Sequence, residues 1–221
     1  MNMTGVGNYV SLYGIYASNI VIRDSAKVII DVAGSDSHNT GIICSTISVE
    51  DNASIDITVT GNKQYTTNGI NATQWASFTS KAESNITVYA KPDSLDAPVG
   101  YGVIVGSSFD DREGNGNITV KNGSLNVTMH NPDRLLGTIG SALCSKGKNG
   151  VILIENATVV TTIGDTNAIN KKAAIASEAV TGGTITDSII IKNSNVTVNG
   201  MQGGGIRSNN YGVLIENSNG T

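Results

Sequence analysis

The acidic run Asp110-Asp111-Arg112-Glu113 carries the residue types best suited to chemistry in this chain. Two adjacent carboxylates can share a proton or bind a cation such as calcium. Neighbouring residues of a strand point to opposite faces, so these carboxylates converge only in a loop, which the flanking serines and glycines predict. The candidate catalytic residues are Asp110, Asp111 and Arg112, and the candidate metal ligands are Asp110, Asp111 and Glu113. A solvated loop is the simpler interpretation, so we expect no cofactor, with calcium as the alternative.

The two histidines, His38 and His130, both lie in polar corner segments. Neither has cysteine or aspartate at the spacing of a zinc site, so we expect an exposed His38 and a structural or solvated His130. The sequence also contains no serine nucleophile elbow and no phosphate-binding glycine loop.

Aromatic residues gather in one part of the chain, where Tyr65, Trp75 and Phe78 precede Tyr101. Tryptophan and tyrosine combine a large apolar ring with a polar group, and sugar rings stack on such surfaces when they are exposed. Tyr65, Trp75 and Tyr101 are therefore the candidate ligand-binding residues, with a glycan as the expected ligand. Packing of Trp75 over an apolar edge is the alternative.

A three-part unit recurs along the chain and must position these residues. Its first part is a small residue followed by an aliphatic one, and its second and third parts alternate aliphatic and other residues. This period-two alternation predicts half-buried strands of three to six residues. The first part occurs at Gly14–Ala17, Gly41–Cys44, Gly69–Ala72 and Gly102–Val105, with looser copies at Ser141–Cys144, Ala173–Ala176 and Gly204–Arg207.

A polar turn separates the second part from the third in each copy. Asparagine and aspartate favour such turns because they tolerate the left-handed conformation and bond to nearby backbone. The gap between the flanking aliphatic residues is six residues in the first two copies and five from the fourth copy on, so the turn loses one residue. In the third copy Phe78 and Ser80 take the places of the aliphatic residues. The turn residues are Asp24, Asp51, Asn122, Asn156, Asn193 and Asn217.

This order predicts an all-β solenoid of about seven coils, each with three short strands that pair in parallel at about 4.8 Å. The chain resembles the right-handed parallel β-helix of the pectate-lyase-like superfamily. More narrowly, it resembles the Gly-Ile-x-Ala and Ile-x-Ile-x-Asn coils of bacterial cell-surface and adhesin-like proteins. The resemblance covers residues 12–221 as one domain, with residues 1–11 as an N-terminal cap or lead-in. A β-sandwich is the competing fold, but it explains the recurring order less well.

The resemblance implies two classes of function. Pectin-cleaving members of the superfamily use carboxylates beside a basic residue, which implies a polysaccharide lyase or glycoside hydrolase that acts on acidic glycans through Asp110, Asp111 and Arg112. The Gly-His-Gly and Arg-Ile-Lys elements of the related hydrolases are absent. We therefore favour a non-catalytic extracellular or cell-surface module that displays loops to a glycan or a host protein, or that acts as a spacer. A viral fibre segment is a third interpretation.

Composition excludes several partners. Charged residues make up 14% of the 221 residues, and 14 basic residues are scattered among 18 acidic ones, so nucleic acid is not expected. No stretch approaches the roughly 18 apolar residues of a membrane span. The last repeat is unfinished and no signal peptide is present, which suggests a segment of a longer protein. Unpaired strands at its open ends predict end-to-end self-association.

The two cysteines, Cys44 and Cys144, fall at the same place of the repeat, in the second and fifth coils. Three coil spacings would hold them roughly 14 Å apart, whereas the Cα atoms of a disulfide lie within about 7 Å. We expect two free, buried thiols at small inward sites.

Overall fold

The computed structural model describes residues 2–5, 11–34, 38–61, 66–89, 100–106, 116–130, 138–164, 170–171, 173–178, 182–200 and 205–221. All regular structure within these ranges is β-strand. The strands form two large sheets and one small pair, and neighbouring strands run parallel. The prediction of an all-β protein with parallel pairing is therefore confirmed.

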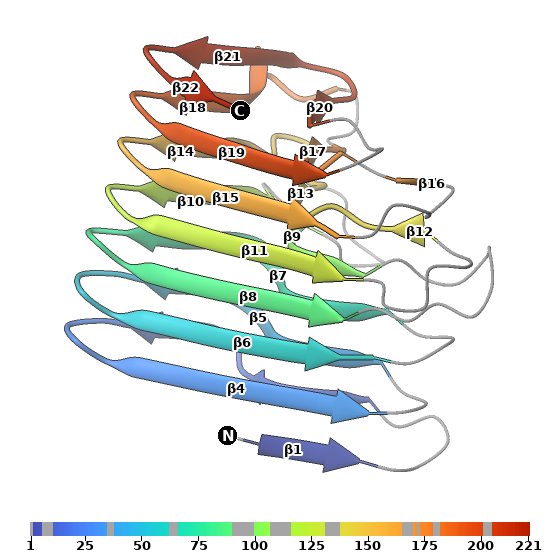
Figure 1. Ribbon diagram of the computed structural model, residues 1–221. Helices are drawn as coiled ribbons and strands as arrows, with labels where there is room; N and C mark the ends of the chain where they lie inside the picture. Colours follow the sequence, from blue (N-terminus) through green and yellow to red (C-terminus); the bar gives the residue numbers. More distant parts are fainter. Residues whose placement is uncertain are drawn as a thin grey trace.

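Sheet A is the eight-stranded sheet at the front of Figure 1. Its strands lie side by side in the order of the chain, so each pairs with strands about 20 to 40 residues away. They are β1 (Asn2–Gly5), β4 (Lys27–Gly34), β6 (Ser54–Thr60), β8 (Glu83–Tyr89), β11 (Ser124–His130), β15 (Thr158–Ile163), β19 (Asn195–Gly200) and β22 (Asn219–Gly220).

Sheet B has twelve strands and contains the first and second parts of the repeat. In β5 and β7 these two parts form one continuous strand of 11 and 13 residues, so the prediction of strands of three to six residues is wrong there. It is also too short for β4, with 8 residues, and for β6, β8 and β11, with 7 residues each. The strands are β2 (Leu12–Tyr16), β3 (Asn19–Ile22), β5 (Asn39–Val49), β7 (Thr67–Thr79), β9 (Tyr101–Val105), β10 (Asn117–Lys121), β13 (Leu143–Ser145), β14 (Ile152–Glu155), β17 (Ile175–Ser177), β18 (Asp187–Lys192), β20 (Ile206–Ser208) and β21 (Gly212–Glu216). A separate pair joins β12 (Thr138–Ile139) to β16 (Asn170–Lys171).

The chain passes alternately between the two sheets, and its two ends lie at opposite ends of the stacked strands (Figure 1). Parallel pairing in register places equivalent residues side by side. We call such a row of paired residues a column. One inward column of sheet A contains Ile30, Ile57, Ile86 and Val127, all of which are buried.

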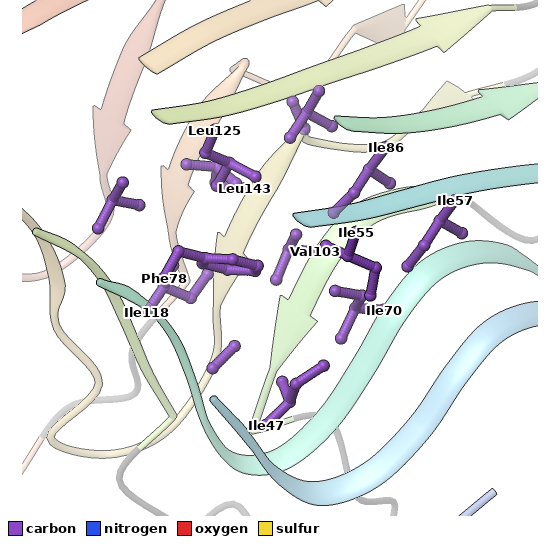
Figure 2. Packing of buried hydrophobic residues seen from close by; sticks show 14 of the residues in the cluster. Ile47, Ile55, Ile57, Ile70, Phe78, Ile86, Val103, Ile118, Leu125 and Leu143 are labelled. Carbon is purple, nitrogen blue, oxygen red and sulfur yellow. The ribbon is translucent and has the colours of Figure 1, made fainter. Parts of the chain in front are cut away.

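The space between the sheets is filled by aliphatic side chains from both (Figure 2). Ile57 and Ile86 enter it from sheet A, and Ile70 and Val103 enter it from sheet B. Ser84 interrupts the aliphatic column of Ile55 and Leu125, and its buried hydroxyl has no partner in the described part of the chain. An unsatisfied buried hydroxyl is destabilising, and in the described part of the chain the buried hydroxyl groups of Ser141, Ser145 and Ser177 have no partner either.

Glycine begins the first part of the repeat because the two sheets approach closely there. A Cβ atom added to Gly69 would contact the Ile86 side chain and would lie 2.6 Å from the carbonyl oxygen of Gly102. Gly41 and Gly14 have equivalent surroundings, one and two strands away. This column of glycines lets sheet B lie against the isoleucines of sheet A.

The predicted turn residues all adopt the left-handed conformation, with φ between 47° and 65° for Asp24, Asp51, Asn122, Asn156, Asn193 and Asn217. In the third copy Ser80 and Lys81 both have positive φ. Ser80 therefore belongs to the turn, and its assignment to an aliphatic position was wrong. Phe78 pairs with Val49 and Val120, and it is the residue equivalent to them.

The looser copies of the first part are shifted by one residue from their predicted alignment. Leu143 pairs with Val103 and with Ile175, so Ala142 takes the place of Gly102. The sequence analysis had placed Ser141 in the position of Gly102, because this copy matches the small-then-aliphatic pattern only loosely. The shift changes which side chains of β13 face the interior.

Candidate functional site

The acidic run predicted for catalysis or calcium, Asp110, Asp111, Arg112 and Glu113, lies outside the described residues, and so does Tyr65. Within the described ranges, no group of three or more His, Cys, Asp or Glu side chains is arranged to hold a metal ion. The same ranges contain no helix long and apolar enough to cross a membrane. Trp75 and Tyr101 are the predicted ligand-binding residues whose surroundings can be described.

Trp75 lies near the middle of sheet B, on β7, with a paired strand on each side. It forms a column with Thr46 of β5 and Asn117 of β10. The next residue, Ala76, is buried in the core, so alternation turns Trp75 to the outer face. Its side chain is 38% exposed.

The position of Trp75 differs from that of the other large exposed hydrophobic residues in the described part of the chain. Tyr16 and Val21 lie on strands β2 and β3, and Val213 and Ile215 lie on strand β21, all at the ends of sheet B. Ile29 lies on β4, near one end of sheet A. Trp75 is exposed in the middle of sheet B, where strands pair with β7 on both sides.

A row of hydroxyl groups lies beside Trp75. Ser77 lies two residues after Trp75 on β7 and forms an outward column with Ser48 and Thr119. All three are half-buried, and their hydroxyl groups have no hydrogen-bond partner within the described residues. At the usual strand dimensions this row runs roughly 7 Å from the Trp75 column, with about 4.8 Å between successive hydroxyl groups.

Hydrogen bonds hold the two residues that flank Trp75 in place. The hydroxyl of Thr46 donates to Oδ1 of Asn19 at 2.7 Å. Oδ1 of Asn117 accepts the backbone N–H of Val151 at 2.9 Å. We call the six residues Thr46, Ser48, Trp75, Ser77, Asn117 and Thr119 the Trp75 face. It is an uncharged surface with one aromatic ring and three hydroxyl groups that have no partner within the described residues. Hydrogen bonds hold its two flanking residues, Thr46 and Asn117, in place.

Among the described residues, charged side chains begin only beyond this face. Glu50 and Lys121 follow Val49 and Val120 at the ends of β5 and β10. Nζ of Lys121 is paired with Oε2 of Glu155 at 2.7 Å. The charge of the described surroundings therefore favours a neutral ligand over an acidic one.

No protein-family model, no curated protein and no solved structure matches this chain.

Tyr101 does not join Trp75. It pairs with Asn68 at the opposite end of β7, and its backbone N–H donates to Oδ1 of Asn68 at 3.2 Å. Its side chain is 6% exposed and packs with Ile104 and Cys144 in a small cluster apart from the main core. The structure thus separates two residues that sequence proximity had grouped.

The Tyr101 cluster carries a buried cation–aromatic contact. Nζ of Lys146 lies 4.9 Å from the centre of the Tyr101 ring and 3.5 Å from Oε2 of Glu178. Burial by itself lowers the pKa of Lys146, but the neighbouring Tyr101, Cys144 and Glu178 outweigh it, so its pKa is raised. The lysine stays charged and fastens β9 to the segments that follow β13 and β17.

The two cysteines are free and buried, as predicted, but they do not occupy the same place in the repeat. Cys44 pairs with Ala72 in an inward column, and burial raises the pKa of its thiol to about 11. Cys144 pairs with Ile104, one position away from the residue equivalent to Cys44, and therefore lies on the opposite side of the sheet. The one-residue shift of the looser repeat copy explains the error.

Neither histidine belongs to a group that could hold a metal ion within the described part of the chain. His38 is exposed, as predicted. His130 is half-buried and stacks on Tyr89 of the neighbouring strand, with 4.9 Å between ring centres and 11° between ring planes. This contact gives His130 a structural role where strands β8 and β11 of sheet A end.

Sequence reasoning found Trp75 but missed Ser48, Ser77 and Thr119. Their signal is present, because each lies between two aliphatic or aromatic residues of an alternating segment and must face outward. Only the register of β5, β7 and β10 shows that the three form one row beside Trp75.

Proposed function

We propose that this chain is a non-catalytic, glycan-binding module of an extracellular or cell-surface protein. Its scaffold would be a right-handed parallel β-helix of about seven coils, of the pectate-lyase-like kind. The alternation of the chain between two parallel sheets, the column of glycines and the column of left-handed turns all support this architecture. Such a rod holds outward side chains at fixed spacing over its whole length.

The exposed indole of Trp75 in the middle of sheet B is the observation that carries the proposal. An exposed tryptophan offers an apolar face to the C–H groups of a sugar ring while its N–H remains able to donate. The hydroxyl groups of Ser48, Ser77 and Thr119 lie where ring hydroxyls of the same sugar chain could exchange hydrogen bonds with them. Since the Trp75 face is uncharged, its ligand is a neutral glycan.

The single tryptophan of the chain makes the proposal directly measurable. Neutral oligosaccharides that a glycan array selects are titrated into the protein while its tryptophan emission is recorded. Binding is expected to shift the emission to shorter wavelength and to protect it from a soluble quencher. Trp75→Ala is expected to weaken retention on the array about tenfold or more, the factor that roughly 1.4 kcal/mol of lost contact produces.

Two matched variants separate the indole from its surroundings. Ser77→Ala removes one hydroxyl of the row and is expected to weaken binding less than Trp75→Ala does. Tyr16→Ala removes an exposed ring at the edge strand β2 and is expected to leave binding unchanged. Failure of every neutral glycan to bind, or full binding by Trp75→Ala, would overturn the proposal.

The same array distinguishes the catalytic alternative. A lyase or hydrolase that used Asp110, Asp111 and Arg112 would release fragments from acidic glycans with time, in a calcium-dependent manner for a lyase of the pectin-cleaving kind. We expect retention without cleavage, with and without calcium.

A further inference from the structure

The row of hydroxyl groups beside Trp75 continues across sheet B as a row of aliphatic side chains. Thr119 of β10 pairs with Leu153 of β14, and Leu153 pairs with Ile190 of β18. Ile152 and Ile189, which precede them in the chain, are buried in the core, so alternation turns Leu153 and Ile190 to the outer face. The complete column contains Ser48, Ser77, Thr119, Leu153 and Ile190.

Leu153 and Ile190 form a partly exposed apolar strip within the sheet, which we call the aliphatic row. β14 pairs with β10 and β18, and β18 pairs with β14 and β21, so neither residue lies on an outermost strand of sheet B. Both are half-buried, and neither belongs to the core between the sheets. A single apolar side chain on a surface needs no explanation, but these two adjoin the exposed indole of Trp75 and extend one continuous surface.

A row of charged side chains runs beside the aliphatic row. Two residues further along the same strands, Lys121, Glu155 and Lys192 pair in register and alternate in sign. Nζ of Lys121 lies 2.7 Å from Oε2 of Glu155, and Nζ of Lys192 lies 3.0 Å from Oε2 of Glu216. At the usual strand dimensions this charged row lies roughly 7 Å from the aliphatic row. Because each lysine is paired with a carboxylate, the charged row has no excess positive charge to attract an acidic sugar.

The two rows match the two kinds of surface on a pyranose ring whose substituents are equatorial. Such a ring has C–H groups on its faces and hydroxyl groups around its edge. Placed with one face on Leu153 or Ile190, it removes apolar surface of both partners from water. Its edge hydroxyls then reach the charged row, where a carboxylate accepts and an ammonium group donates hydrogen bonds. An aliphatic row alone would not distinguish a sugar from a lipid, whereas the adjoining charged row favours the sugar.

The apolar surface extends across the strands and not along them. On β7 the residues two positions before and after Trp75 are Thr73 and Ser77, both polar. Across the sheet, in the order β7, β10, β14, β18, the apolar contacts are Trp75, Leu153 and Ile190 (Figure 1). A long ligand that keeps contact with all three must therefore cross the strands, on a path that slants from the column of Trp75 to the aliphatic row.

We propose that the ligand is a linear, β-linked, neutral polysaccharide with equatorial substituents, bound across the strands of sheet B from Trp75 to Ile190. The inference rests on the proposed function, to which it adds the kind of chain, its direction and its length. Strands are spaced at about 4.8 Å, close to the length of one sugar unit in an extended chain, so successive units meet successive strands. Three strand spacings separate β7 from β18, so about four units fill the site.

A series of oligosaccharides of increasing length tests the proposal on the full chain. β-1,4-linked glucose oligomers are titrated while the emission of Trp75, the single tryptophan, is recorded. Affinity is expected to rise at least about tenfold between the dimer and the tetramer and to level off for longer chains. The α-1,4-linked oligomers of the same sugar are the matched ligands, because their chains curve and cannot follow the aliphatic row. Their affinity is expected to stay constant with length.

Variants of the aliphatic row separate its contribution from that of Trp75. Leu153→Asn and Ile190→Asn replace an aliphatic side chain by a polar one and are expected to remove most of the gain from added sugar units. Both should leave the affinity for the dimer unchanged, whereas Trp75→Ala weakens binding at every length. Val160→Asn makes the same kind of change at a half-buried outward residue of β15 in sheet A and is the control, with an unaltered length dependence.

The outcomes distinguish this inference from the proposed function. Neutral glycans that bind through Trp75 without a gain beyond the dimer, or with a gain that Leu153→Asn and Ile190→Asn leave intact, would overturn the inference and leave the proposed function standing. An equal gain from an alkyl chain attached to the dimer would show that the aliphatic row receives a lipid tail, which also overturns it. Failure of every neutral glycan to bind would overturn both.

Discussion

At the scale of single residues, burial decides the chemical state of the side chains inside the molecule. Cys44 lies in an inward column beside Ala72, and the apolar interior disfavours its thiolate, which raises the pKa of the thiol to about 11. A thiolate is the reactive form of cysteine, so Cys44 is inert in the folded protein at neutral pH.

This pKa shift predicts a pH dependence of stability. Below about pH 9 the Cys44 thiol is protonated in both the folded and the unfolded chain, and its contribution is constant. As the pH rises from about 9 to about 11 the unfolded chain ionises first, so the free energy of unfolding falls, by roughly 1–2 kcal/mol. Denaturant unfolding at several pH values measures this loss.

Cys44→Ala is the matched variant for this prediction, because alanine already occupies the paired position at Ala72. The variant should lack the part of the loss that is due to Cys44. Equal losses in the two proteins would contradict the assignment.

At the scale of elements, the glycine column sets the distance between the sheets. Gly69→Ala would bring a methyl group against Ile86 and within 2.6 Å of the carbonyl oxygen of Gly102, and a backbone atom cannot move aside cheaply. We expect the free energy of unfolding to fall by about 1–3 kcal/mol, as overpacked cores generally show. Denaturant unfolding measures the change.

Gly205→Ala is the control for this effect. The nearest atom to a Cβ at Gly205 is Cγ1 of Val198 at 3.8 Å, an ordinary contact distance. The free energy of unfolding is expected to change by less than about 0.5 kcal/mol. A similar loss in both variants would show that glycine matters for chain flexibility and not for the approach of the sheets.

At the scale of the whole molecule, each strand contacts mainly the strands paired with it, so local stability depends on the position of a strand in its sheet. β7 has paired strands on both sides, whereas β21 pairs with β18 alone and exposes Val213 and Ile215. Backbone amides are therefore expected to exchange slowest in β5–β8 and fastest in β20–β22. Hydrogen exchange followed by mass spectrometry measures both regions. Uniform exchange along the chain would contradict this description.

Much of the local structure could be predicted from the sequence. Alternating aliphatic residues indicated the strands, and the polar residues between them indicated left-handed turns, which Asp24, Asp51 and Asn156 adopt. These features depend on backbone preference and on the period of the strand, which act within a few residues. The parallel pairing followed from the recurrence of the three-part order.

The candidate site was predicted only in part. Trp75 stood out as the single tryptophan of the chain, but Tyr101 had been grouped with it on the basis of sequence proximity, and the structure places the two at opposite ends of β7. Cys144 was assigned to the wrong side of the sheet through a shift of one residue. A shift of this size reverses every side chain of a strand, and a loosely matched repeat does not determine it.

The sequence by itself determined that this is an all-strand, repeating protein with an aliphatic interior, because alternation and turn chemistry are local properties. Only the tertiary structure decided the register, and with it the row of hydroxyl groups beside Trp75 and the burial of Tyr101. These features depend on which residues of strands far apart in the chain lie side by side. That pairing is set by the packing of the two sheets against each other and not by any short segment.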